Sequence, residues 1–280
     1  MTRPRLLSWA QADLALGGAQ LAVAVAIALA GGLLWTQDPL AGSMFATFRP
    51  PGAVATGLWH PLGTDQIGRD LLARIIAGMR ISLTIVLVSG AIGAVLGTAA
   101  GVVAGYAGGW VDAVLMRLVD IQLAVPFILL ILLIMAVLGP STFNLVVVLG
   151  VTSWPIYART ARARVLEVRE MEYIESARAI GATLPRILWR HVLPNILAPV
   201  LVLLTLDLPR LVVMEASVGF LGLGVQPPTP TLGNLIGEGK SYLLNAQWLV
   251  IWPGLAISLL VVGFNLLGDW LVRRTDARAA

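Results

Sequence analysis

Residues 121–158 contain no charged side chain, and this run constrains the fold more than any other feature of the sequence. An α-helix rises about 1.5 Å per residue, whereas the hydrocarbon core of a bilayer is about 30 Å thick. One straight helix of this length would be much longer than a single crossing requires. The run therefore predicts two membrane-spanning helices, separated at the turn-forming residues 139–142, which read Gly-Pro-Ser-Thr.

The composition agrees with a chain that is largely immersed in lipid. Of its 280 residues, 58% are hydrophobic and only 12% are charged, and the mean hydropathy is +0.87. A soluble domain has no means of hiding so much apolar surface from water. The sequence has no cysteine and two distant histidines, which excludes disulfides and thiolate metal sites, and we expect no metal site at all.

Six apolar segments are long enough to act as spans, so we expect an all-α polytopic membrane protein with six transmembrane helices. They are residues 14–35, 81–106, 112–138 and 143–157, a segment that begins after Pro194, and residues 248–270. Residues 1–80 then hold the N-terminal tail, the first span and an extracytoplasmic segment. Residues 81–275 form a core of five spans, with a cytoplasmic loop at residues 165–194.

The distribution of basic residues predicts the orientation, because cytoplasmic loops collect Lys and Arg. With the N-terminus inside, thirteen arginines lie on the inner side and five basic residues lie on the outer side. We therefore expect both termini in the cytoplasm. The net charge of +4 is then a matter of topology, and we expect no nucleic-acid partner.

Glycines recur at every fourth position of the second expected span. The series is Gly93, Gly97, Gly101 and Gly105, and Ser89 extends it backwards. Small residues at this spacing let two helices approach closely in lipid, where no hydrophobic force drives them together. Helix packing is the favoured interpretation, and lining of a permeation path is the alternative.

Three ionisable residues fall within the fifth expected span, namely Asp207, Arg210 and Glu215. Charged groups at membrane depth normally face the bundle interior or an aqueous cavity and are paired. Asp207 and Arg210 are spaced to pair with each other on one helix face. Two roles stay open: an ion pair that holds the bundle together, or a lining of the substrate pathway. Pro199 and Pro209 are expected to bend this helix.

Two further segments on the outer side invite a functional interpretation. Residues 63–80 resemble an amphipathic helix, which would be an interfacial lid or a contact for an extracytoplasmic binding protein. Residues 237–241, Gly-Glu-Gly-Lys-Ser, resemble part of a phosphate-binding loop. Asn234 stands where that motif requires glycine and no strand precedes it, so we expect no nucleotide site.

The loop at residues 165–194 is rich in charge although the chain as a whole is not. Good helix formers predict one helix over residues 165–180, Gly181 provides a bend, and a second short helix is expected over residues 183–193. Such an element suits an interfacial helix, an ordinary cytoplasmic loop or a docking site for a partner. The residues alone leave these three interpretations open.

The motif residues in this loop are Glu175, Ser176, Ala177, Gly181, Leu193 and Pro194. Their spacing resembles the "EAA, three residues, G, nine residues, I-x-L-P" signature of permease subunits in binding-protein-dependent ABC importers. Ser176 replaces the second alanine, and His191 stands where the general motif has isoleucine. Residues 62–83, 215–236 and 264–271 resemble the dipeptide, oligopeptide and nickel branch, in particular its dipeptide permease C-type subunit.

The resemblance implies a type I ABC importer permease (MetI-like) fold in a bacterial inner membrane. It implies half of a translocation pathway for di- or oligopeptides, with nickel, glutathione or another small solute as alternatives. The implied partners are a second homologous permease subunit, two ATPase subunits and an extracytoplasmic solute-binding protein. ATP and magnesium would be bound by the ATPase subunits, so this chain would hold no cofactor and catalyse no reaction.

Two other classes of protein remain as alternatives. A secondary transporter would need no ATPase, but such proteins often show two similar halves with paired broken helices, and no such repeat is visible. An intramembrane enzyme would need a nucleophile and a base at bilayer depth, for which only Asp207 and Glu215 are available.

Overall fold

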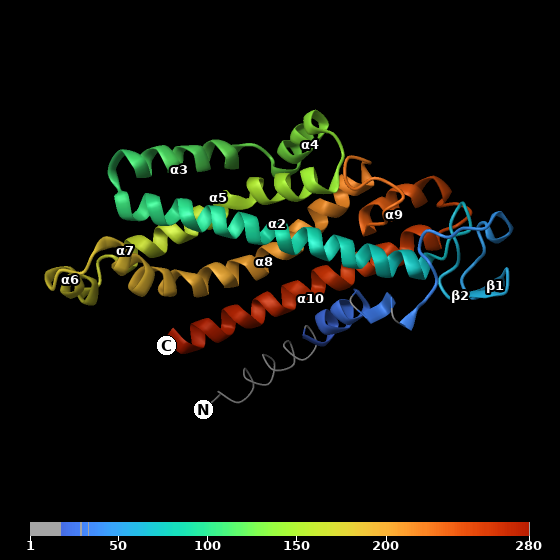
Figure 1. Cartoon of the computed structure of the whole chain (residues 1–280), viewed down its shortest axis with the longest axis horizontal. Helices are drawn as coiled ribbons and strands as arrows, with labels where there is room; N and C mark the ends of the chain where they lie inside the picture. The colour runs from blue at the N-terminus through green and yellow to red at the C-terminus, as the bar shows by residue number, and fades with distance from the viewer. Residues whose placement is uncertain (1–17, 29, 33, 280) are drawn as a thin grey trace, which may run out of the picture.

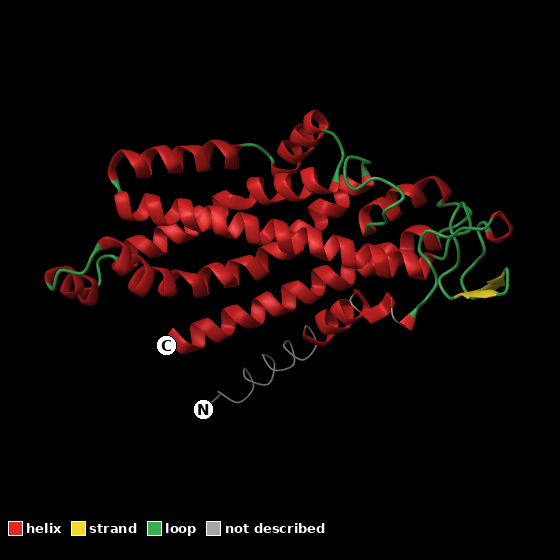
Figure 2. Cartoon of the chain, viewed as in Figure 1, coloured by secondary structure: helices red, strands yellow, loops and turns green. Residues whose placement is uncertain are grey.

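The computed structural model describes residues 18–28, 30–32 and 34–279, and these are mostly helical (Figure 2). Four long helices run lengthwise through the molecule (Figure 1). They are α2 (Leu71–Ala107), α5 (Thr142–Val168), α8 (Leu193–Phe220) and α10 (Trp248–Ala279). The shorter helices are α3 (Gly109–Ala124), α4 (Phe127–Leu138), α6 (Glu172–Ala179), α7 (Leu184–Ile187) and α9 (Leu232–Gly239).

Irregular structure is concentrated at the two ends of this bundle. One end carries the antiparallel hairpin of β1 (Ala53–Ala55) and β2 (Leu58–His60), together with the 3-10 turns η1 (Met44–Ala46) and η3 (Lys240–Tyr242). The opposite end carries α6 and α7 (Figure 1). We call these the hairpin end and the α6 end.

Three described helices are long and apolar enough to cross a membrane, namely Leu71–Ala107, Leu184–Phe220 and Trp248–Arg273. The pair α3 and α4 would provide a fourth crossing. Residues 18–28 form a shorter apolar helix, while residues 14–17 of the first expected span lie outside the described part. The count of six spans therefore remains a prediction.

The third expected span, residues 112–138, is not one straight helix. It is divided into α3 and α4, which are bent by 90° relative to each other. Val125 is extended and Pro126 follows it directly. Proline lacks the N–H that would continue the helix and forces the residue before it out of the helical region, so the chain turns here.

The expected amphipathic helix at residues 63–80 is also wrong as a separate element. Residues 63–70 are loop, and Asp70 caps the start of α2 by accepting a hydrogen bond from the Ala73 N–H at 2.8 Å. Residues 71–80 are the first turns of the second span, which is 37 residues long. At about 1.5 Å per residue this helix is about 56 Å long, so it extends beyond the hydrocarbon core.

The glycine series of α2 packs against α5. A Cβ atom built on Gly93 would collide with Ser153 Oγ, and one on Gly97 would collide with the Trp154 carbonyl. Gly101 meets the Ala158 carbonyl in the same way, and a Cβ on Gly105 would lie 2.9 Å from Val165 Cβ. The ridge therefore brings the backbones of α2 and α5 together over the C-terminal part of α2.

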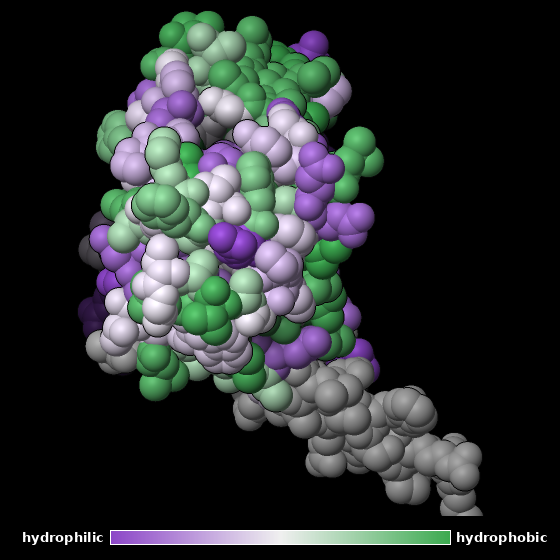
Figure 3. All heavy atoms as spheres, turned by 90° about the vertical axis from the view of Figure 1, so that its right-hand side faces the viewer, coloured by the Kyte–Doolittle hydropathy of each residue, from purple (hydrophilic) through white to green (hydrophobic). Residues whose placement is uncertain are grey.

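The hairpin end has a mixed surface (Figure 3). Hydrophilic and hydrophobic residues alternate across the face of this end, while hydrophobic residues gather at the top of the view, at the height of α4 in Figure 1. The exposed apolar side chains of the hairpin itself are Val54, Leu58 and Trp59.

Candidate functional site: the α6 end and a buried ion pair

The motif loop at the α6 end is a protruding helix, not the extension of a span. The helix expected over residues 165–180 is interrupted, because α5 ends at Val168 and a turn at residues 169–171 precedes α6. This turn is fixed from another helix: Arg169 Nη1 donates a hydrogen bond to the Gly105 carbonyl at 2.9 Å, at the end of α2. The local sequence cannot predict this contact, because the two residues are 64 positions apart.

A small apolar cluster holds α6 and α7 to the bundle. It consists of Val165, Val168, Ile174, Ile187, Val192 and Ile196. Ala177 of the motif is also buried, so one face of α6 is used for attachment. Ile174 and Ile187 are therefore buried within the chain itself and need no lipid or partner to cover them.

The other face of this element is uncovered. Glu175, Ser176 and Gly181 of the motif are exposed. Next to Gly181, the side chain of Ile180 is 86% exposed. Trp189 is 74% exposed as well, but it lines an apolar groove formed by α2 and α8. A large apolar group exposed on a protruding element is typical of a contact surface for another protein.

Gly181 makes the bend that the sequence predicts. Its φ angle is +82°, in the left-handed region where side chains other than glycine are strained. Apart from its two chain neighbours, no described residue has an atom within 4 Å of the position that a Cβ would occupy on Gly181. The need for glycine here is therefore conformational and does not come from close packing.

The second expected short helix, residues 183–193, continues into the fifth span without a break. The segment α7 leads through a π-helical turn at Leu188–Val192 directly into α8, and Leu184–Phe220 counts as one apolar helix. Pro194 thus lies inside a continuous helix and does not open a new one. The π turn precedes it, which is how a helix accommodates a residue without an N–H. Leu193 is half-buried against the apolar cluster.

Asp207 and Arg210 form the ion pair that their spacing predicts. Arg210 Nε lies 2.7 Å from Asp207 Oδ1, and Asp207 is buried. The hydroxyl of Tyr157 on α5 donates a hydrogen bond to Asp207 Oδ2 at 3.0 Å. The guanidinium carbon of Arg210 lies 4.2 Å from the centre of the Phe127 ring, at the start of α4. Three helices therefore meet at this pair.

Glu215 does not join the pair. Its side chain is 1% exposed, and neither carboxylate oxygen has a hydrogen-bond partner among the described residues. The hydroxyls of Ser82 and Thr231 are its polar neighbours. Five residues along a helix place Glu215 on a different side of α8 from Arg210.

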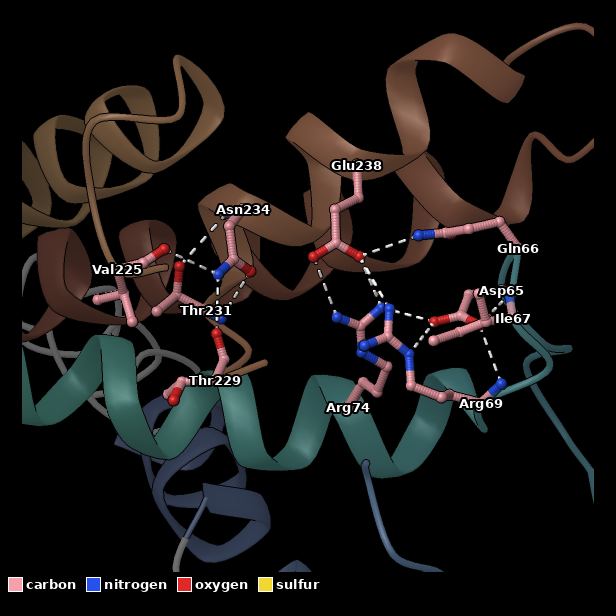
Figure 4. Close-up of polar contacts among 10 residues, drawn as sticks. All are labelled: Asp65, Gln66, Ile67, Arg69, Arg74, Val225, Thr229, Thr231, Asn234 and Glu238. Carbon is pink, nitrogen blue, oxygen red and sulfur yellow. Dashed lines mark hydrogen bonds and ion pairs between the residues drawn. The ribbon is translucent and has the colours of Figure 1, made fainter. Parts of the chain in front are cut away.

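A buried ion network at the hairpin end is the feature that the sequence did not reveal (Figure 4). Arg74 Nη1 lies 2.7 Å from Asp65 Oδ2 and 2.9 Å from Glu238 Oε2. Arg69 bridges the same two acids at 2.6 and 3.1 Å. Arg74 is 1% exposed. The network joins the start of α2 to α9, across more than 160 residues of sequence.

The helix α9 also explains why residues 237–241 do not form a phosphate loop. Such a loop precedes a helix, whereas Gly237 and Gly239 here lie at the end of one. Glu238 is occupied by the ion network. The helix starts at a capping box in which Thr231 N–H donates to Asn234 Oδ1 at 2.8 Å (Figure 4).

A family model for "Binding-protein-dependent transport system inner membrane component" matches residues 97–280. The chain belongs to this family. It is a multi-pass membrane permease component of an ABC importer, a class in which separate ATPase subunits hydrolyse ATP. Among the sequence features, the permease motif was the one that indicated this family.

Curated relatives match over most of the chain. A probable D,D-dipeptide transport system permease protein of Escherichia coli is 37% identical over 88% of this chain and 81% of its own length. A di/tripeptide transport system permease protein of Pseudomonas aeruginosa is 43% identical over 78% of this chain and 72% of its own. A glutathione transport system permease protein of Pectobacterium atrosepticum is 42% identical over 78% of this chain and 73% of its own.

The fold is that of a solved importer. An inward-facing structure of the MetNI methionine ABC transporter superposes with a TM-score of 0.60 and 25% identity. The match covers 72% of this chain and 95% of the other. The expected type I, MetI-like permease fold is thereby confirmed.

Proposed function

We propose that this permease forms half of a translocation pathway for short peptides in an ATP-driven importer. The observation that carries the proposal is the similarity to permeases named for dipeptides and for di/tripeptides, at 37–43% identity over most of the chain. Glutathione is a second candidate solute, since a glutathione permease is equally similar. It is itself a tripeptide, so both candidates belong to one chemical class.

The α6 end is proposed as the docking site for an ATPase subunit. The exposed motif residues Glu175, Ser176 and Gly181 lie beside the uncovered Ile180, which supports this role. The attachment of α6 through Ile174 to the bundle would pass a movement of the ATPase to α5 and α8. Closure of two ATPase subunits on ATP would then open the spans towards the outer side.

The proposed assembly contains this chain, one homologous but distinct permease subunit, two ATPase subunits and an extracytoplasmic binding protein. In the proposed orientation the α6 end and both termini are cytoplasmic. Arg69 and Arg74 lie on the outer side in this arrangement, but both are buried in ion pairs with Asp65 and Glu238.

Purification and uptake test the proposal together. The tagged chain is expected to co-purify with two ATPase subunits and a second permease, and the complex in proteoliposomes should take up a labelled dipeptide when ATP and the binding protein are supplied. Mass spectrometry of the ligand held by the purified binding protein identifies the solute. Uptake by this chain alone, driven by an ion gradient, would overturn the proposal in favour of a secondary transporter.

A further inference from the structure

Arg210 lies well inside the membrane-spanning helix α8, where a charged side chain is energetically costly. It lies ten residues before the end of α8 at Phe220, which at about 1.5 Å per residue is about 15 Å along the helix. Its side chain is 36% exposed in this chain. The neighbouring positions of the same helix face, Leu206, Val213 and Phe220, are also uncovered. This face of α8 is therefore open to the pathway or to a partner.

The ion pair uses only part of the guanidinium. Asp207 accepts a hydrogen bond from Arg210 Nε on one oxygen and from the Tyr157 hydroxyl on the other, so each oxygen of the acid has a partner. Among the described residues, Nη1 and Nη2 of Arg210 have no hydrogen-bond acceptor. The ring of Phe127 supports the guanidinium plane at 4.2 Å. The side chain is thus fixed in place while its fork of N–H donors stays free.

Arg210 lines a cavity of about 160 Å³ at the bend between α3 and α4. This volume corresponds to about five water molecules at roughly 30 Å³ each, which is enough for a carboxylate group. The other polar groups of the lining have partners within the chain. Gln122 accepts from Trp154 Nε1 and donates to the Thr152 carbonyl.

The two hydroxyls of the lining are also satisfied. Thr152 Oγ1 donates to the Val148 carbonyl at 2.6 Å, and Ser153 Oγ donates to the Gly150 carbonyl at 3.0 Å. The donors of Arg210 are therefore the unused polar groups of this cavity within the described chain. A fork of parallel N–H donors matches a carboxylate, which accepts two hydrogen bonds at once.

We propose that Arg210 is a selectivity residue on the translocation pathway and that it binds the carboxylate of a short peptide in transit. The inference rests on the proposed function, because it needs a peptide as the solute. Asp207 neutralises part of the arginine charge and thereby keeps the binding weak. Weak binding is what conduction requires, since a passing group must also leave.

The test compares two probes, Ala-Ala with a free carboxylate and the same dipeptide as its C-terminal amide. Uptake of each is measured with the whole complex in proteoliposomes, with the binding protein and ATP present. The variant is D207N/R210Q, which removes both charges together and strands neither. The binding protein's own preference is common to all variants and cancels when ratios of acid to amide uptake are compared.

The expected result is a fall in the acid-to-amide ratio of about tenfold in D207N/R210Q relative to the parent, because a charge-assisted bidentate contact is lost. The matched control is E167Q/R164Q, an exposed pair with the same spacing on α5. It should leave the ratio unchanged. An unchanged ratio in D207N/R210Q overturns this inference alone. A parent complex that moves neither probe overturns the proposed function as well.

A second measurement needs no substitution. Phenylglyoxal modifies accessible arginines, and mass spectrometry of the digested complex measures the rate at each position. Millimolar Ala-Ala should slow the modification of Arg210 several-fold, while the amide should not. Arg80, an exposed residue of α2, is the internal reference. Equal rates with both probes, or an Arg210 that is unreactive because a partner subunit covers it, would overturn the assignment.

Discussion

Two glycines of this chain are required for different physical reasons. Gly181 is needed for its positive φ, with open space around the position of a side chain. Gly97 has ordinary helical geometry but lies against the backbone of α5. Glycine is therefore required for its backbone conformation at position 181 and for its small size at position 97. Matched substitutions distinguish these two requirements.

For Gly181, Gly181→Val should uncouple ATP hydrolysis from uptake, whereas Gly181→Asn should retain most coupling. Asparagine tolerates the left-handed region, while a β-branched residue is strongly disfavoured there, with a penalty of about 1–2 kcal/mol or more. The measurement is the number of peptides imported per ATP hydrolysed in proteoliposomes. If the valine variant couples ATP hydrolysis to uptake as well as the parent does, the bend at Gly181 is not needed for docking.

For Gly97, Gly97→Ala should destabilise the complex by roughly 1–3 kcal/mol, because even one methyl group meets the Trp154 carbonyl. Gly254→Ala is the matched control, since its Cβ would meet no other part of the described chain within 4 Å and alanine is the better helix former. Thermal unfolding of the purified complex gives the comparison. Equal midpoints for the two variants would contradict close packing at the ridge.

The helices show what a sequence can and cannot specify. The pairing of Asp207 with Arg210 and the shared face of the four glycines follow from helical periodicity, so both were predictable. The helices of the motif loop follow in part from local sequence, but the turn at residues 169–171 depends on a contact between Arg169 and the end of α2. The amphipathic interpretation of residues 63–80 failed for a related reason: Arg74 looks like part of a polar face until Glu238 is placed beside it.

The buried ion network at the hairpin end gives a prediction about how elements are held together. Arg74→Met should destabilise the protein by about 3–5 kcal/mol, because it leaves Asp65 and Glu238 sharing Arg69 as their remaining arginine. Arg80→Met, six positions further along α2 and exposed, should have little effect. Complex yield and unfolding temperature are the measurements. Equal losses in the two variants would show that the network contributes nothing specific.

The bend between α3 and α4 is the other element that the sequence left hidden. Pro126 was present in the sequence, but the apolar run around it continues without interruption, and hydropathy alone does not register a change of direction. The bend places the Phe127 ring against the Arg210 guanidinium and creates the small cavity that this guanidinium lines. A span interrupted in this way is a frequent setting for a binding site inside a membrane.

At the scale of the whole molecule, the two ends have different surfaces and the proposed orientation gives each its own environment. The α6 end exposes Ile180 beside the motif, as a protein-docking surface would, and should face the cytoplasm. The hairpin end carries the exposed β1–β2 hairpin and the buried network, and should face outward. The apolar flanks between them fit lipid and a second permease subunit.

The absence of cysteine from the sequence makes this orientation directly measurable, because every introduced thiol is the only one in the chain. Val54→Cys lies on the hairpin, where the native side chain is 71% exposed, and Ser176→Cys lies on the exposed face of α6. In spheroplasts, a membrane-impermeant maleimide should label the thiol at position 54 at once. The thiol at position 176 should react only after permeabilisation, and less when the ATPase subunits are co-expressed. The reverse pattern would place the motif loop outside the cell, where no ATPase can reach it, and would refute both the orientation and the docking role of α6.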